Sequence, residues 1–138
     1  MVPRFRAFLT ETKTIHDVLQ IDLSRSMVSL KIENASEWYW FKEVVLMQST
    51  GLKDKNGVEI YEGDIVQSTW YDVDNNPYKK KGEITFVGAQ YVIVYDSQFD
   101  VETGEITYDA HSLTYAEDAE VIGNIYENPE LLEQAHEN

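Results

Sequence analysis

The segment QSTGLKDKNGVEIYEGDIV, residues 48–66, decides how the rest of this chain is read. Asn56 and Gly57 in its middle are a tight-turn signal, because both residue types tolerate the positive φ that a two-residue reversal requires. A β-strand is expected to start at Asp64, directly after the polar part of the segment. The segment is therefore predicted to be a shaped connector that leads into a sheet.

Two more glycines and one apolar pair complete this segment. Gly51 and Gly63 are expected to adopt backbone conformations that disfavour a Cβ. Ile60 and Tyr61 are the large apolar pair between the turns, so we expect them to face inward and hold the connector against the sheet. The polar residues around them are expected to be solvated: Lys53, Asp54, Lys55, Glu59 and Glu62. A structural role is favoured for the segment, and a binding or catalytic role is the alternative.

The composition is that of a folded, acidic protein. The chain has 138 residues, 43% of them hydrophobic, and a formal net charge of −14. This length is enough for one domain or two small subdomains with a sizeable core. Every Lys and Arg lies at or before Lys81, so the segment from Gly82 onward has a formal charge of −13. That half is not expected to bind nucleic acid, because phosphate binding depends on a cluster of cations.

The absence of cysteine excludes several classes of site. With no Cys in the chain, a disulfide framework, a thiol nucleophile and Cys-ligated metal sites are all excluded. No stretch approaches the roughly 20 apolar residues that a membrane helix needs. The first residues also lack the long apolar core of a signal peptide. We therefore expect a cytoplasmic protein without membrane contact.

The densest aromatic cluster consists of Trp38, Tyr39, Trp40 and Phe41. Successive residues of a strand point to opposite faces, so the four side chains cannot all enter one core. An exposed pair would form a partner site or an oligomer contact. Packing across a junction between two subdomains is the alternative.

Alternating hydrophobic residues predict strands along most of the chain. These strands are expected at residues 2–9, 28–32, 44–49, 64–71, 83–87, 91–95, 106–108 and 119–126. Residues 14–21 fit either a strand or one helical turn, and the strand is favoured. Gly123 inside the last run predicts a bulge or a close backbone approach. Asn128, Pro129 and Glu130 are typical of the first positions of a helix, so a short helix is expected to begin there.

These patterns together predict a mainly β protein in three parts. Residues 1–47 are expected to form a β-rich N-terminal subdomain, and residues 48–63 a connector with glycine turns. Residues 64–138 are expected to form a small SH3-like β-barrel with a short C-terminal helix. The barrel inference rests on five short strands at turn-limited spacing.

Two segments of the chain resemble the YopX family of small phage and prophage proteins. Family members carry a nearly identical string, TGLKDKNGKEIYEGDIV, at the position of residues 50–66. The ending EVIGNIYENPELL, residues 120–132, is a second hallmark of the family. The resemblance implies a phage or prophage origin, and it names no chemistry.

Catalytic and metal-binding motifs are missing from the sequence. His16, His111 and His136 lie in three separate parts of the chain, and none has the spacing of a metal-binding motif. Nothing in the sequence matches a GxSxG nucleophile elbow, a Walker loop or a GxGxxG motif. No catalytic residue, metal or cofactor is therefore predicted.

Three functional hypotheses follow. The favoured one is a non-enzymatic phage accessory protein that acts by protein–protein contact, with a host or phage protein as partner. Self-association into a homo-oligomer is expected as well, through the aromatic cluster and open sheet edges. The second is an acidic DNA mimic that inhibits a host nucleic-acid-binding protein. The third is an enzyme that uses an unfamiliar pair of acids, for which the sequence nominates no pair.

Overall fold

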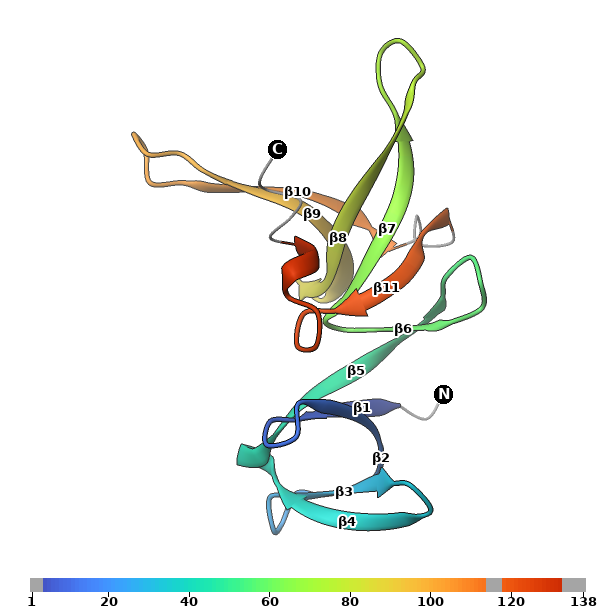
Figure 1. Cartoon of the computed structure of the whole chain (residues 1–138). Coiled ribbons are helices and arrows are strands. Elements are labelled where there is room, and N and C mark those ends of the chain that lie inside the picture. The colour runs from blue at the N-terminus through green and yellow to red at the C-terminus, as the bar shows by residue number, and fades with distance from the viewer. Residues whose placement is uncertain (1–3, 114–117, 133–138) are drawn as a thin grey trace. The chain divides into compact units, whose positions relative to one another are not determined.

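The structure is a computed structural model that describes residues 4–113 and 118–132. It divides the chain into two compact units: unit 1, Met1–Ser49, and unit 2, Thr50–Asn138. Both are built from antiparallel strands (Figure 1), which confirms the predicted mainly β class. Within the described residues, no helix has the length and apolar character needed to cross a bilayer.

Within the described residues, eleven strands and a short 3₁₀ helix precede the helical residues 130–132. Their bounds are β1 Phe5–Leu9, β2 Thr14–Asp22, β3 Met27–Ile32, β4 Ala35–Trp40, η1 Phe41–Glu43, β5 Val44–Lys53, β6 Glu59–Tyr61, β7 Asp64–Tyr71, β8 Pro77–Val87, β9 Gln90–Phe99, β10 Ile106–Ser112 and β11 Glu120–Asn124. Residues 14–22 form a strand, as favoured from the sequence. The predicted connector contains the end of β5 and all of β6.

Unit 1 is a meander of antiparallel strands in the order β4-β3-β2-β1-β5, and β4 is its outer strand. Val28 and Leu30 of β3 are fully buried, as their spacing of two predicts. They pack with Ala7, Leu9 and Val44 in one small core. Consecutive strands pair from β1 to β4, and β5 returns to pair with β1, which brings Val44 to the core residues of the first strand.

Unit 2 contains a five-stranded antiparallel sheet in the order β10-β9-β8-β7-β11. Its core comprises Ile60, Val66, Ile84, Ile93, Tyr95, Leu113 and Ala119. The last strand of the chain, β11, pairs with the first strand of this sheet, β7. Strands β10 and β11 stand at the two ends of this order, and the SH3-like barrel stays a prediction.

Strands β8 and β9 are longer than their hydrophobic runs indicate. Residues 79–81, the basic run, lie inside β8, where the ladder with β7 continues to Pro77. Lys79 donates from Nζ to Thr69 Oγ1 at 2.7 Å on the neighbouring strand. The Lys80 ammonium lies 4.5 Å from the centre of the Trp70 ring. These polar strand ends are therefore held by main-chain pairing and cation–π contact rather than by burial.

The β7–β8 and β9–β10 hairpins project from the sheet (Figure 1) and end in similar tips. At one tip Asp72 Oδ1 accepts the N–H of Asp74 at 2.9 Å. At the other, Asp100 Oδ1 accepts the N–H of Glu102 at 2.9 Å. Each tip thus places a carboxylate on either side of one apolar residue. The apolar residues, Val73 and Val101, are 101% and 86% exposed.

The predicted irregularity at Gly123 is confirmed. The register of β11 against β7 shifts between Val121 and Gly123, which is a bulge. A Cβ on Gly123 would lie 2.5 Å from Asn128 Oδ1, so the backbone approach is also close. The short helix expected after Asn128 is present, because residues 130–132 are helical. The Asn128 side chain binds back to the strand, where its Oδ1 accepts the N–H of Asn124 at 3.2 Å.

Candidate contact surface

Strand β4 divides the aromatic cluster between two faces. Trp38 and Trp40 are 45% and 48% exposed and share one face, because they are two residues apart in a strand. Tyr39 points the other way and, with Phe41, packs against the core of unit 1. The prediction that the four aromatics cannot share one core is confirmed. Both indoles are about half exposed, and a partner contact stays a prediction.

A hollow of about 650 Å³ lies beside Trp38. Its other lining residues come from the end of β2 and the turn that follows: Gln20, Ile21, Asp22, Leu23 and Ser24. Leu23 is 80% exposed. The turn is held by Asp22, whose Oδ1 accepts the Ser24 hydroxyl at 2.6 Å and whose Oδ2 meets Arg25 Nε at 3.2 Å. The Ser24 hydrogen bond is the main cause that lowers the pKa of Asp22.

The opposite face of β4 carries a short tyrosine–glutamate hydrogen bond. The Tyr39 hydroxyl donates to Glu37 Oε2 at 2.6 Å. This bond, with burial and the negative charges of Glu37, Glu11 and Glu43, raises the pKa of Tyr39 to about 12. Glu43 also accepts the Trp40 N–H, at 2.9 Å from Oε2. Carboxylates thus bind the Tyr39 hydroxyl and the main-chain N–H of Trp40 on this strand.

The glycines of residues 48–66 adopt the backbone conformation expected of them. Gly51, Gly57 and Gly63 have φ values of 81°, 81° and 88°. Asn56 is not among the positive-φ residues, so the turn uses one left-handed residue instead of two. Gly57 closes it by donating its N–H to the Asp54 carbonyl at 3.1 Å.

The apolar pair and Asp64 lie where β6 meets β7. Ile60 is fully buried, as expected, and Tyr61 is half-buried with its hydroxyl donating to Glu59 at 2.7 Å. Strand β7 starts at Asp64, as predicted. The Asp64 carboxylate is buried, and its Oδ2 accepts the Tyr61 N–H at 2.8 Å. These residues therefore fix the corner between two strands.

The expectation that Asp54 is solvated is wrong. Asp54 is 6% exposed, and its carboxylate accepts three main-chain N–H groups. Oδ1 accepts from Asn56 at 2.8 Å and Val58 at 2.9 Å, and Oδ2 accepts from Val121 at 2.8 Å. Burial alone would raise the pKa of Asp54, but these hydrogen bonds together hold it below its usual value. Asp54 joins the turn to β11, a contact that no local sequence pattern reveals.

Asp54 and Val121 lie in the two segments that resemble YopX proteins, residues 50–66 and 120–132. The family model described as YopX protein matches residues 4–133. The chain belongs to the YopX family. Among solved structures, protein EF1440 from Enterococcus faecalis is similar to this family member, with 31% sequence identity and a TM-score of 0.59. The similarity covers 96% of this chain and 99% of EF1440. No curated protein matches.

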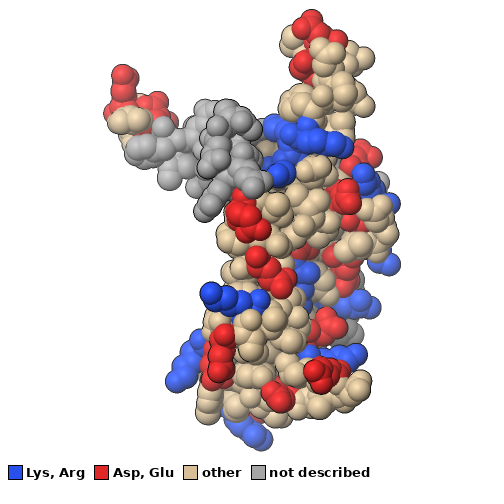
Figure 2. All heavy atoms as spheres, in the orientation of Figure 1, with Lys and Arg blue, Asp and Glu red and all other residues tan. Residues whose placement is uncertain are grey.

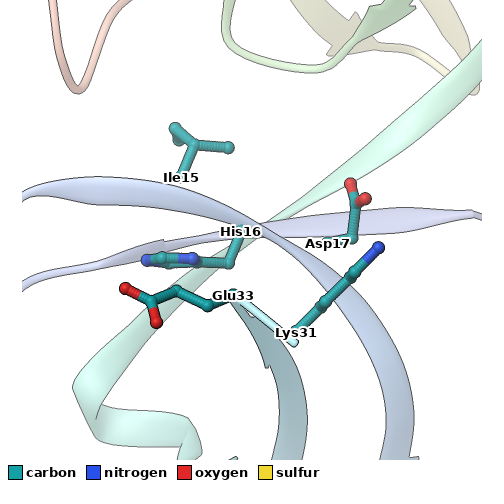
Figure 3. A pocket seen from close by; sticks show the side chains of 5 residues that line it. All are labelled: Ile15, His16, Asp17, Lys31 and Glu33. Atoms are coloured by element: carbon teal, nitrogen blue, oxygen red, sulfur yellow. The ribbon is translucent and has the colours of Figure 1, made fainter. Parts of the chain in front are cut away.

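A second pocket of this YopX family member surrounds His16 on β2 (Figure 3). It has a volume of about 320 Å³ and is lined by Ile15, His16, Asp17, Lys31 and Glu33. His16 Nε2 lies 2.6 Å from Thr14 Oγ1, and its ring lies beside the Glu33 carboxylate in Figure 3. A hydroxyl, an imidazole and a carboxylate are the parts of a nucleophile–base pair. Thr14 is exposed to solvent, however, and no catalytic role is assigned to this pocket.

An acidic group in unit 2 was not found from the sequence. Burial, and secondly the charge of Glu62, raise the pKa of Glu83, against the opposing hydrogen bond from Thr85. Burial and then the charges of Glu62 and Glu83 raise the pKa of Tyr126. Glu62 and Glu83 are far apart in sequence, and only strand pairing brings their segments together, through the Gly63 N–H to Ile84 carbonyl bond at 2.9 Å. Among the residues that the structure describes, no three His, Asp or Glu are placed to hold a metal ion.

Proposed function

We propose that this YopX family member is a non-enzymatic accessory protein of a phage or prophage, which acts in the bacterial cytoplasm by protein–protein contact. The observation that carries the proposal is the exposure of Trp38 and Trp40 on the outer strand of unit 1. Tryptophan is strongly enriched among the residues that dominate binding energy at protein interfaces. Two half-exposed indoles beside an open strand edge offer apolar area and main-chain hydrogen-bonding groups together.

The charge of unit 1 supports this proposal. Residues 1–49 contain six Lys or Arg and six Asp or Glu, so their formal charge is zero. A contact made by a neutral unit through apolar side chains gains little from long-range attraction. Its strength is therefore expected to change little with ionic strength.

A comparison of three immobilised proteins tests the proposal. The wild-type chain, a Trp38→Ala/Trp40→Ala variant and a Phe86→Ala control are used to capture proteins from a bacterial host lysate at low and high salt. Phe86 is 52% exposed, which is similar to the exposure of the two tryptophans, but it lies in unit 2 and not in unit 1. A partner retained by wild type and control, and lost by the double variant at both salts, supports the proposal. Equal capture by all three proteins contradicts it.

The alternative function is mimicry of DNA by unit 2. Residues 50–138 hold the other five Lys or Arg and the other nineteen Asp or Glu, and therefore the whole formal charge of −14. Figure 2 shows acidic side chains at the ends of both projecting hairpins. These tip residues are Asp72, Asp74, Asp100, Glu102 and Glu105. A surface of this kind would attract a host protein whose own surface is basic enough to bind nucleic acid.

Salt distinguishes the two functions. Mimicry works through charge, so capture of a host partner would weaken steeply as salt is raised. It would also weaken when Asp74→Asn and Glu102→Gln are combined, because these changes remove tip charges and keep the side-chain size. The Trp38→Ala/Trp40→Ala variant would then capture the partner as well as wild type does. Capture that survives high salt and the loss of both tip charges rejects mimicry.

A further inference from the structure

The hydrogen-bonding pattern of β4 shows which of its main-chain groups face the open edge. The Phe41 N–H donates to the Ser26 carbonyl at 2.9 Å, directly beyond the pair formed by Trp40 and Met27. Hydrogen-bonded and non-hydrogen-bonded pairs alternate along an antiparallel ladder. The N–H and C=O groups of Ser36, Trp38 and Trp40 therefore point away from β3, toward the open edge.

One of these outward groups is already bound. The Trp40 N–H donates to Glu43 Oε2 at 2.9 Å. Within the described part of the chain, the outward N–H and C=O groups of Ser36 and Trp38 make no hydrogen bond. Ser36, Glu37 and Trp38 are all exposed, so nothing described covers this edge. The outward N–H and C=O groups of Ser36 and Trp38 are therefore available to pair with another strand.

We propose that a second copy of this chain pairs its own β4 with this edge, antiparallel and about a two-fold axis, with Trp38 opposite Trp38 of the second copy. This inference rests on the proposed function, because it names the partner of the same surface. The formal charge of unit 1 is zero, so the two paired units do not repel each other through net charge. The acids of unit 2 act through screening water, where the Debye length is about 8 Å at physiological salt.

Charge also selects the register. A two-fold axis at Glu37 would place two Glu37 carboxylates opposite each other, and like charges at such positions are destabilising. An axis at Trp38 places Glu37 opposite Tyr39 of the second copy, the residue type whose hydroxyl already donates to Glu37 within one chain at 2.6 Å. The Trp38 register pairs Ser36 with Trp40 of the second copy, so Glu43 must release the Trp40 N–H to the Ser36 carbonyl. This register avoids the repulsion between the two Glu37 carboxylates, and it aligns the four indoles of the pair on one face of a continuous sheet.

Proline at Ser36 tests the strand pairing. The Ser36 N–H points to the open edge, so Ser36→Pro removes a donor from the new ladder without removing one from the β3–β4 ladder, and edge strands tolerate proline. Ser36→Ala is the matched control. Light scattering at physiological salt is expected to give wild type and Ser36→Ala twice the 16.0 kDa mass of one chain. Ser36→Pro is expected to give the monomer mass. A wild-type monomer, or equal masses for the proline and alanine variants, overturns the inference.

Disulfide trapping tests the register and remains decisive if the proline variant does not fold. The chain has no cysteine, so introduced thiols are the only ones. With the axis at Trp38, residue 37 of one copy lies opposite residue 39 of the other, whereas identical positions are offset by two residues, about 7 Å along the strand. Glu37→Cys mixed with Tyr39→Cys is expected to form crosslinked dimers, and each variant alone is not. Crosslinking of Glu37→Cys alone, or no crosslinking in the mixture, rejects this register.

Lysate capture and light scattering together distinguish a failure of this inference from a failure of the proposed function. A lysate partner that is lost with Trp38→Ala/Trp40→Ala but kept with Ser36→Pro supports protein contact through the indoles and rejects strand pairing between copies. A dimer that Ser36→Pro dissociates, together with lysate capture that ignores the tryptophans, supports the strand pairing and rejects the indoles as the site for other partners.

Discussion

The two units of the chain differ in their charge and in the side chains that they expose. Unit 1 is neutral and exposes indoles on its outer strand. Unit 2 holds the full charge of −14, buries the Asp54 carboxylate in its interior and exposes acids at its hairpin tips. Apolar contact and electrostatic attraction are therefore assigned to different parts of the molecule. Substitutions in one unit can therefore be used to test whether the stability or binding of the other unit changes.

The largest effect is expected from Asp54→Ala. The change removes the acceptor of three N–H groups, those of Asn56, Val58 and Val121. Asn56 and Val58 are exposed, so water can replace the carboxylate there, whereas the Val121 N–H loses its partner in a part-buried contact with β11. The free energy of unfolding of unit 2 should fall by about 1–3 kcal/mol. Hydrogen exchange should show faster exchange throughout unit 2 and unchanged exchange in unit 1. Equal acceleration in both units would break the comparison between them.

Asp72→Ala is the matched control for that variant. Asp72 Oδ1 accepts N–H groups two and four residues ahead, from Asp74 at 2.9 Å and Asn76 at 2.8 Å, as Asp54 Oδ1 does. It differs in being exposed at a hairpin tip, where water can replace the carboxylate. The expected loss of stability is below about 1 kcal/mol. A loss as large as that of Asp54→Ala would show that burial and the bond to Val121 are not what make Asp54 important.

This pair also shows how far the sequence can be used for prediction. Asp54 and Asp72 both precede a turn, and the turn after Asp54 was predicted from the local pattern of Asn56 and Gly57. What separates the two is the bond from Asp54 to Val121, 67 positions along the chain, which exists only after β11 has paired with β7. The raised pKa of Glu83 could not be predicted for the same reason, because its burial depends on how the sheet packs. The alternation of Trp38 and Trp40 with Tyr39 is a local property of a strand, and it was predicted.

A smaller effect is expected from Gly57→Ala. The φ of Gly57 is +81°, and no atom lies within 4 Å of where a Cβ would stand, so the cost is conformational and not steric. The free energy of unfolding should fall by about 1 kcal/mol, the penalty for a left-handed residue with a Cβ. Asn56→Gly should be nearly neutral. Urea unfolding measures both, and an unchanged midpoint for Gly57→Ala would mean that this turn does not constrain unit 2.

Glu83→Gln is expected to stabilise unit 2 at neutral pH. Burial raises the pKa of Glu83 above its usual value of 4.5, so folding favours the protonated form. The ionised carboxylate therefore costs stability above its folded-state pKa, and that cost disappears as pH falls toward 4.5. The melting temperature of the variant should exceed that of wild type at pH 7, with a gap that closes on acidification. A gap that is constant with pH would show that the charge of Glu83 is not responsible.

The smallest effect on stability is expected from Trp38→Ala/Trp40→Ala measured at low protein concentration, where chains are monomeric. Both indoles are about half exposed and lie on the face opposite the core, so the loss should be below about 1 kcal/mol. Urea unfolding of unit 1 provides the measurement. A loss of several kcal/mol would place the indoles in the core and leave unit 1 without a contact surface.

The bond between Asp54 and Val121 also has a consequence for biosynthesis. A ribosome adds about 5–20 residues per second, so roughly 3–13 s separate the emergence of these two partners. Unit 1, which ends at Ser49, needs no residue from that later stretch for its own strands to pair. The open edge of β4 is thus complete while the acidic unit is still being made. Neighbouring nascent chains on one messenger RNA would meet through their neutral units first, before the repelling charge of the second unit has emerged.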